Sequence, residues 1–528
     1  VVCGAVFAAF FARLAWMQFA RADYYADKAA EASSASYTIT QHAARGVITD
    51  ANGVVLARDT TVYDLYLRIP APPGTDLRET VKNIETLTGS KDVETQLAAF
   101  CSAASAGELA VARGADADML TAFYTAGLVQ SGAVRPAARG VRSWMGGTLL
   151  PHALGLTGPI TAAQWPAAKA RGLAMDAVIG QSGLEAAYDD LLRGQDGRVL
   201  INTGFDGAVR RTAQLRQAVP GAALVLTVDS SLQKALQDAL ISQIHTLQTT
   251  KAAGAGRECR AGAAVVVDVK TGGILAAASV PGFDLNACRA DYAALAADTA
   301  APLLDRTAQG LYAPGSAFKP AVAAAALTVG IDPAATVNCT GRYGFYSGYQ
   351  PGCLQYGHSG PVDLRTALEH SCNIFFYDVG RRLGVDTFSA MAQQLGLAAP
   401  TGVEVAEARG RLTWSSDGNY QAGLTLMAAI GQGNTAVTPL QLAAYAATLA
   451  NYGQRPALHY ADRAVSAATG ETLGEITRVD SYPAHKVYTV RGAREYLIPA
   501  VPDVFIKSVD LDANRMEVQV WEGMATDE

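Results

Sequence analysis

The stretch LYAPGSAFKPAVAAAALTVG, residues 311–330, contains a Pro-Gly pair, which interrupts regular secondary structure, followed directly by a helical pattern. Pro314 and Gly315 end the preceding element, and an Ala-rich helix is expected to begin at Ser316. Lys319 follows at the spacing that puts two side chains on one helix face, within hydrogen-bonding reach of Ser316. The stretch therefore predicts a serine and a lysine held together at the N-terminus of a helix.

This pair has the residue types of a serine nucleophile and its base. A serine hydroxyl is a poor nucleophile unless a neighbouring base takes its proton, and a lysine is that base only where its surroundings favour the neutral amine. Burial and the positive end of the helix dipole both disfavour the charged amine, and the same dipole stabilises the oxyanion that forms when Ser316 attacks a carbonyl. On this motif alone, a capped helix with a lysine that reaches solvent stays an open alternative.

A second motif favours the catalytic interpretation. The segment ALEHSCNIFFYDVGRRLG, residues 367–384, contains the only Ser-x-Asn of the chain, formed by Ser371 and Asn373. The Ser371 hydroxyl can relay a proton between Lys319 and a leaving group, and the Asn373 amide can hold a peptide-like substrate or position the lysine. Ser316, Lys319, Ser371 and Asn373 are therefore the predicted catalytic residues.

Two other short motifs have structural explanations. Ser231 and Lys234 form a further Ser-x-x-Lys, but they lie at the start of an amphipathic helix, and no turn presents the serine to a cleft. Lys270, Thr271 and Gly272 join two apolar runs, and glycine supplies the positive φ that a tight hairpin needs. We expect neither group in the active site.

Composition and the first residues bound the class of protein. The chain has 528 residues, 50% of them hydrophobic, and its net charge of -6 offers no basic surface to a nucleic acid. The opening VVCGAVFAAFFA is apolar and then meets Arg13, whereas a membrane-spanning helix needs about 20 such residues. With aromatic residues following, it predicts the second half of an N-terminal membrane anchor, and a buried core helix is the alternative.

The seven cysteines are widely spaced and include no C-x-x-C pair. This spacing indicates neither a zinc site nor a dithiol redox motif, and no cofactor is expected. Cys339 and Cys353 bracket a loop rich in glycine and tyrosine. They are candidates for a loop-closing disulfide if the domain faces an oxidising compartment.

Residues 35–217 predict short strands and turns with helical insertions, among them an Ala-rich helical tract over about 93–128. Asn52 and Gly53 lie between two alternating apolar runs and predict a hairpin. Ser182 is placed to cap a helix with apolar residues at helical spacing. No cluster of catalytic residue types occurs in this part of the chain.

Together these motifs resemble those of the class B penicillin-binding proteins, membrane-anchored peptidoglycan DD-transpeptidases of bacterial elongation or division. The resemblance covers residues 1 to about 455 and rests on RGVITDANGVVLA, IGQSGLEAAYDDLLRGQDG, LTVDSSLQ, VVVDVKTGGILAAASVPGFDLN, YAPGSAFKP, SCNIFF and GQGNTAVTPLQLAAYAATLAN. It implies that Ser316 attacks the D-Ala-D-Ala end of a stem peptide or is acylated by a β-lactam. It also implies that Lys319 is the general base and that Ser371 and Asn373 relay the proton and contact the substrate.

The fold class implied is multidomain α+β. Residues 1–20 are expected to form a partial membrane anchor, residues 21–217 a β-rich pedestal of the dimerisation type, and residues 218–464 a transpeptidase domain. That domain is expected to be an incomplete antiparallel sheet with helices on both faces. Residues 465–528 resemble the C-terminal PRC-barrel domain of the ribosome maturation factor RimM, particularly in REYLIPAVPDVFIKSVD and EGM, and predict a small β-barrel-like tail.

The third motif of the resembled family is missing here. In that family a Lys-Thr/Ser-Gly triplet follows Ser-x-Asn on the edge strand of the sheet, but beyond Asn373 the only lysines are Lys486 and Lys507, and neither precedes Thr-Gly or Ser-Gly. The transpeptidase domain is therefore expected to be truncated after about 451–464, with the tail as an artificial or accidental fusion. Losing one oxyanion-hole donor costs roughly 10²- to 10³-fold in rate, so we expect a poor or inactive enzyme.

The resemblance implies stem peptides and β-lactams as ligands, elongation or division proteins as partners, and no nucleic acid. It also implies a single N-terminal anchor in a bacterial cell membrane, with the catalytic domain extracytoplasmic. Two alternatives stay open. A non-catalytic cell-wall assembly scaffold acting through the pedestal is favoured by the missing third motif, and an RNA- or ribosome-binding protein is supported only by the tail. A β-lactamase or sensor is disfavoured by the long pedestal-like region.

Overall fold

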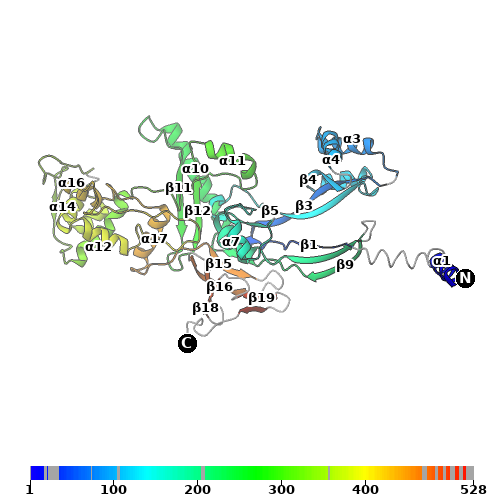
Figure 1. The fold of residues 1–528 in the computed structure, drawn as a ribbon. Helices are drawn as coiled ribbons and strands as arrows, with labels where there is room; N and C mark the ends of the chain where they lie inside the picture. The colour runs from blue at the N-terminus through cyan, green and yellow to red at the C-terminus, as the bar shows by residue number, and fades with distance from the viewer. Residues whose placement is uncertain are drawn as a thin grey trace.

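Figure 1 shows a computed structural model of the chain. It describes residues 2–16, 21, 35–72, 74–103, 107–175, 177–203, 209–354 and 357–465, and then the backbone of strands between 472 and 518. The molecule is elongated, with helix α1 (Val2–Ala15) at one end and the helices of the predicted catalytic region at the other. Within the described ranges, no helix has the length and apolar character needed to cross a membrane.

The N-terminal half is rich in strands, as predicted, but its main strands are long and not short. Strand β3 (Val55–Ile69) pairs with β4 (Gly107–Ala115) and β5 (Val134–Trp144), and β2 (Ile48–Thr49) precedes it in a hairpin. Gly53 has a φ of 84° in that hairpin, which confirms the expected turn. A separate sheet has the order β1-β8-β9, formed by β1 (Ala35–Gln41), β8 (Gly197–Thr203) and β9 (Val209–Arg216).

Short helices cover these strands, and two expectations about them need correction. Strand β4 interrupts the tract over 93–128, because its residues complete the sheet beside β3. Ser182 is the N-cap residue of the helix over Gly183–Ala187, as expected, but it makes no side-chain capping bond, because its Oγ accepts a hydrogen bond from the Leu156 backbone N–H at 3.1 Å. The helices are α3 (Leu77–Thr88), α4 (Val93–Ala103), α5 (Ala117–Thr125), α6 (Pro151–Leu154), α7 (Trp165–Ala170), α8 (Gly183–Ala187) and α9 (Asp189–Leu192), with a hairpin of β6 (Thr157–Pro159) and β7 (Val178–Gly180).

A buried ion network fixes the chain just before β2. The Arg45 guanidinium donates to Glu185 at 2.6 Å and to Asp189 at 2.8 Å, and Arg142 on β5 donates to Glu185 at 2.6 Å. Glu185 has no exposed surface. Because a buried carboxylate is costly without its partners, this network explains why the RGVITD segment holds its position against α8 and α9.

Helix α10 (Ser230–Thr250) opens the second half of the chain. The Asp229 carboxylate caps it by accepting hydrogen bonds from the backbone N–H groups of Ser231 and Leu232. Lys234 forms an exposed ion pair with Asp238 at 2.6 Å. The second Ser-x-x-Lys is therefore a helix start, as expected.

Strands β11 (Gly262–Val267) and β12 (Ile274–Val280) form the expected hairpin. Gly272 has a φ of 83° in its turn, and the Lys270 Nζ donates to Asn451 Oδ1 at 2.8 Å. In the described part of the chain these two strands pair only with each other, while α10 packs on β12 and α17 (Pro439–Ala450) on β11. The sheet of the predicted transpeptidase domain is thus short.

A helical cluster packs around one large hydrophobic core at the far end of the molecule from α1 (Figure 1). In it, α12 contacts α14 and α15, and α14 contacts α16. Its elements are the 3₁₀ turn η2 (Gly315–Phe318), α12 (Lys319–Thr328), β13 (Val337–Cys339), β14 (Gly360–Val362), α13 (Leu364–Glu369), α14 (Asn373–Leu383), α15 (Val385–Gln394) and α16 (Ala422–Ala429). Helix α11 (Cys288–Ala297) lies outside this cluster, near α10 in Figure 1.

The C-terminal strands extend the N-terminal sheet. Strand β15 (Ala461–Val465) pairs with β10 (Ala223–Leu226), and the order runs β18-β17-β16-β15-β10-β2-β3-β4. The others are β16 (Thr472–Ser481), β17 (Lys486–Arg491), β18 (Glu495–Pro499) and a hairpin of β19 (Ile506–Asp510) and β20 (Arg515–Val518). None of the described tail strands pairs with β11 or β12, so none takes the place of the edge strand whose absence is expected from the sequence.

Candidate active site

The predicted nucleophile lies on a turn that glycines shape. Ser316 is exposed in η2, and the α-helix proper begins three residues later, at Lys319. Gly315 has a φ of 60°, and its N–H donates to the Gly431 carbonyl at 2.9 Å. A Cβ on Gly431 would lie 2.2 Å from the Gly315 oxygen, so only glycine permits this contact. The GQG segment, residues 431–433, thus supports the turn that carries Ser316.

The Ser-x-Asn motif forms the tight connection between α13 and α14. Ser371 has a φ of 53°, which a residue with a Cβ rarely adopts. In this conformation both its carbonyl oxygen and its hydroxyl face the Lys319 amine, at 2.7 and 2.9 Å. Asn373 is the first residue of α14, and its Oδ1 lies 2.7 Å from the same nitrogen. The backbone conformation of Ser371 therefore aims the motif at the lysine.

The structure brings all four predicted catalytic residues together. Lys319 Nζ donates three hydrogen bonds, two to Ser371 and one to Asn373, and the Ser371 Oγ lies 2.9 Å from the Ser316 Oγ. The direct contact between Ser316 and Lys319 expected from their spacing is replaced by a link through Ser371, because Ser371 and Asn373 bind the Lys319 amine. The result is a continuous hydrogen-bonded path from the lysine to the exposed serine.

Burial prepares Lys319 to act as a base. Its side chain is 1% exposed, and this burial lowers its pKa from 10.5 to about 8. A lysine with this pKa is neutral in about one molecule in ten at pH 7, against about one in three thousand for an unshifted one. The sequence argument that the lysine must be largely desolvated is consistent with this environment.

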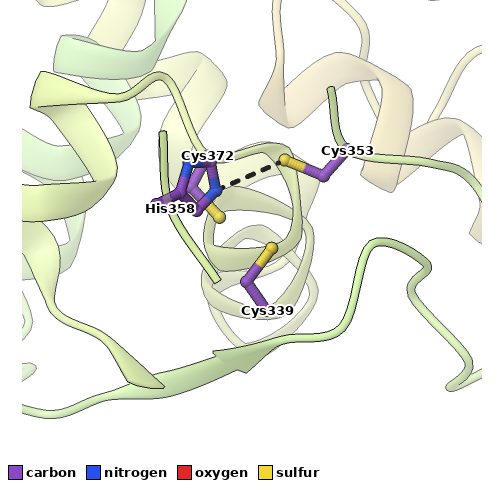
Figure 2. Close-up of side chains that lie close together, drawn as sticks. All are labelled: Cys339, Cys353, His358 and Cys372. Carbon is purple, nitrogen blue, oxygen red and sulfur yellow. Dashed lines mark hydrogen bonds between the residues drawn. The ribbon is translucent and has the colours of Figure 1, made fainter. Parts of the chain in front are cut away.

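A second cluster of reactive side chains adjoins the Ser-x-Asn motif (Figure 2). The ligand atoms of Cys339, Cys353, His358 and Cys372 all lie within 4.8 Å of one another, and the Cys353 sulfur is 3.6 Å from His358 Nε2. In Figure 2 the three sulfurs and the imidazole converge on one small space. A tetrahedral zinc site with Zn–S bonds of about 2.3 Å needs ligand separations of about 3.8 Å, so a small contraction would seat the metal.

Two expectations about the cysteines need correction. The expected disulfide between Cys339 and Cys353 is wrong, because both are thiols here and share their surroundings with His358 and Cys372. Burial also raises the pKa of the Cys372 thiol to about 12, so that it keeps its proton unless a cation replaces it. The second expectation, that the cysteines form no zinc site, is replaced by this candidate site. It could not be predicted because its ligands come from separate elements and lack the close pairs of a zinc finger.

The cysteine cluster contacts the active site through Asn373. Cys372 is the middle residue of Ser-x-Asn, and the Asn373 backbone N–H donates to the Cys353 sulfur at 3.4 Å. The Asn373 side-chain amide donates to the Gly352 carbonyl at 3.3 Å. The loop that carries Cys353 thus holds the same asparagine whose oxygen binds Lys319.

The sequence matches three family descriptions. Residues 40–226 match the "Penicillin-binding Protein dimerisation domain", and residues 262–490 match the "Penicillin binding protein transpeptidase domain". Residues 463–524 match the "RimM PRC barrel domain". The predicted fold class is confirmed: a dimerisation region, a transpeptidase domain and a PRC-barrel tail, built from mixed sheets and helices.

Relatives extend these matches over most of the chain. It is 29% identical to the peptidoglycan D,D-transpeptidase MrdA of Escherichia coli K12 over 458 residues, 78% of this chain and 65% of that protein. It is 28% identical to MrdA of Salmonella typhimurium SL1344 over 439 residues, 79% of this chain and 67% of that protein. The chain therefore spans about two thirds of the length of these relatives.

Two solved structures share the fold. A chain in a structure of a peptidoglycan synthase complex that coordinates polymerization and crosslinking is 30% identical, with a TM-score of 0.66, covering 88% of this chain and 79% of that one. Penicillin-binding protein PBP2 of Helicobacter pylori, in complex with MreC, is 22% identical with a TM-score of 0.66, covering 83% of this chain and 80% of that one. At that identity the second likeness concerns the fold alone.

Proposed function

Because the chain belongs to the class B penicillin-binding protein family, we propose that it is a peptidoglycan D,D-transpeptidase by descent, with Ser316 as its acylated nucleophile. The observation that carries the proposal is the hydrogen-bonded path from buried Lys319 through Ser371 to the exposed Ser316 hydroxyl. An accidental helix cap would not need a base with a lowered pKa at the end of that path.

The first half-reaction uses this path. Neutral Lys319 takes a proton from Ser371, which takes the proton of Ser316 as the Ser316 oxygen forms a bond to the carbonyl carbon of the penultimate D-alanine. The tetrahedral intermediate then breaks its C–N bond, and the proton returns through Ser371 to the leaving D-alanine amine. The product is an ester between Ser316 and the shortened stem peptide.

The second half-reaction runs the same path in reverse. An amine from a neighbouring stem attacks the ester carbonyl, gives its proton to Lys319 through Ser371, and displaces the Ser316 oxygen, which is reprotonated. Asn373 holds the lysine through its side-chain oxygen, while its side-chain amide donates to the Gly352 carbonyl. A β-lactam would stop after the first half-reaction, because its leaving amine stays attached to the acyl group.

The rate is expected to be low. In the described part of the chain the triplet with Lys270 is in the β11–β12 turn, where its amine binds Asn451 and not the nucleophile. No described strand extends the β11–β12 sheet to offer an oxyanion donor beside Ser316. Loss of one such donor costs roughly 10²- to 10³-fold, and the loss of a whole strand costs more because the substrate carboxylate site goes with it.

We also propose that Cys339, Cys353, His358 and Cys372 hold a zinc ion. Three sulfur donors and one imidazole form a soft, closed ligand set typical of structural zinc. Such an ion would neutralise the thiolates and hold the loop of Cys353 against Asn373. It would leave no open position for a reactive water and so would take no part in acyl transfer.

The remaining parts of the proposal concern partners and location. The related PBP2 of Helicobacter pylori is known in complex with MreC, and another relative forms part of a peptidoglycan synthase complex. We propose partners of this elongation type, with stem peptides as substrates and β-lactams as inhibitors. We further propose that α1 belongs to a membrane anchor and that the catalytic region is extracytoplasmic, which would keep the PRC-barrel tail from ribosomes.

A non-catalytic scaffold is the second candidate function, and the short β11–β12 sheet favours it. Mapping of a penicillin adduct distinguishes the two. The full chain is incubated with a fluorescent penicillin, digested and analysed by mass spectrometry. A transpeptidase site carries the adduct on Ser316 and loses it in Ser316→Ala. An adduct on Ser231, the start of the other Ser-x-x-Lys, would contradict the assignment, and a folded chain without any adduct would favour the scaffold.

A further inference from the structure

The cysteine cluster has one side that oxidants can reach. Cys339 is 2% exposed and Cys372 is fully buried, whereas Cys353 is only partly buried and precedes Leu354, which is 71% exposed. A zinc-bound sulfur is a thiolate, the form that reacts with peroxides. Because its sulfur is the most accessible of the three and would be a thiolate when bound to zinc, we expect Cys353 to be the first cysteine of this cluster to be oxidised.

We propose that this cluster is an oxidant-sensitive modification site that switches off acylation at Ser316. The inference rests on the proposed zinc site. Peroxide transfers one oxygen to the Cys353 thiolate, giving a sulfenic acid and hydroxide. A neighbouring thiolate, Cys339 or Cys372, then attacks the Cys353 sulfur, forms a disulfide and expels a second hydroxide. Two protons turn both hydroxides into water, and the zinc ion leaves because two of its four ligands are gone.

The geometry carries the effect to the catalytic residues. A disulfide is about 2.05 Å long, whereas two sulfurs on one zinc ion are about 3.8 Å apart, so closure draws the chain together by nearly 2 Å. Cys353 accepts the Asn373 N–H at 3.4 Å, and the adjoining Gly352 carbonyl accepts the Asn373 side-chain amide at 3.3 Å. Asn373 Oδ1 in turn binds Lys319 at 2.7 Å. The contraction therefore displaces the asparagine that positions the base.

The size of the effect follows from this displacement. A shift of about 1 Å in a catalytic constellation can cost about 100-fold in rate, so oxidation is expected to slow acylation at least tenfold. Reduction with a thiol and then addition of zinc is expected to restore the acylation rate, because a disulfide is reversible whereas general oxidative damage is not. A purely structural cluster far from the nucleophile would lose zinc without this loss of rate.

The test uses the full chain loaded with zinc and treated with hydrogen peroxide. Zinc release is followed with a colorimetric chelator, disulfide formation as a loss of about 2 Da in intact mass with peptide mapping, and acylation with fluorescent penicillin. Cys353→Asp keeps a zinc ligand but removes the accessible thiol. Cys101→Ser is the matched control, because Cys101 is exposed and lies outside the cluster.

We expect the unaltered chain and Cys101→Ser to release zinc, form a disulfide that includes Cys353 and lose acylation reversibly. For Cys353→Asp, the zinc content and the acylation rate after peroxide treatment are expected to equal those of the same variant before treatment. Zinc that stays bound in the unaltered chain, or release that is equally fast in Cys353→Asp, would overturn the inference. So would a disulfide that leaves the acylation rate unchanged.

Failure of the proposed oxidation switch can be distinguished from failure of the proposed transpeptidase function. A purified chain that takes up no zinc overturns the zinc proposal and this inference together, while Ser316 labelling still tests the transpeptidase. A chain that releases zinc and forms the Cys353 disulfide, but shows no Ser316 adduct before oxidation, contradicts the proposed enzyme activity. In that case the modification site stands on its mass and zinc readouts, and its regulatory role is overturned.

Discussion

The pH dependence of acylation tests the role of Lys319 directly. Its three hydrogen-bond acceptors hold the amine in place, and burial lowers its pKa to about 8. The neutral amine is the active form, so the rate rises with pH and levels off above the pKa. The neutral fraction is about 0.09 at pH 7 and about 0.9 at pH 9, which predicts a rise of about tenfold between these two values.

The assay is the second-order rate of penicillin labelling by intact mass, measured from pH 6 to pH 10 and corrected for hydrolysis of the free β-lactam. The proposed loss of an oxyanion donor would lower the rate by the same factor at every pH, so the shape of the pH profile would be unchanged in a slow enzyme. An amine with the ordinary pKa of 10.5 would instead give a rise of about 100-fold from pH 7 to pH 9, with no plateau. Either that profile or a flat one would refute the reasoning.

Three substitutions extend the test. Ser371→Ala breaks the proton path and should slow penicillin labelling about 100-fold without changing the thermal unfolding midpoint; a normal rate would mean that the base reaches the nucleophile by another route. Gly431→Ala should destabilise the chain by about 2 kcal/mol or more in denaturant unfolding, whereas Gly418→Ala, with open space around it, should not. Arg45→Met leaves buried Glu185 with Arg142 as its one remaining arginine and should cost about 3 kcal/mol, whereas Lys234→Met removes only an exposed ion pair and should change little. Similar losses in both variants would contradict the buried network.

The four candidate catalytic residues could be selected from the sequence because each motif lies next to residues that end a helix or a strand. Pro314 and Gly315 predict the turn that carries Ser316. The Ser-x-Asn motif between two helical patterns predicts the turn that carries Ser371. What could not be predicted is the path between them. It depends on the positive φ of Ser371 and on the 3₁₀ turn that carries Ser316, and that turn is held by the close contact of Gly431 with Gly315, which residue spacing alone does not reveal.

The cysteine cluster, unlike the Ser-x-x-Lys and Ser-x-Asn motifs, could not be predicted from the sequence. Its ligands come from β13, the loop after it, the segment before β14 and the N-cap of α14, so only the tertiary fold brings them together. A sequence search for closely spaced pairs has no signal to find there. The pairing of β15 with β10 is similarly non-local: the strands of the tail could be predicted, but not the sheet they join.

The origin of the tail is a separate prediction. The transpeptidase and PRC-barrel matches share residues 463–490, close to the expected junction. If the tail is an artificial or accidental fusion, sequencing the source DNA across Asn451 to Gly474 should show a join between two unrelated genes. One continuous native gene would contradict that explanation.

The measurement that tests the central claim most directly is the rate at which penicillin acylates Ser316. The full chain, Ser316→Ala and the MrdA relative from Escherichia coli are compared by intact mass under the same conditions. The account predicts a Ser316-dependent adduct that forms roughly 10²- to 10³-fold more slowly than on the relative, or slower still, because an oxyanion donor is missing. An adduct that persists in Ser316→Ala, or one that forms as fast as on the relative, would contradict it.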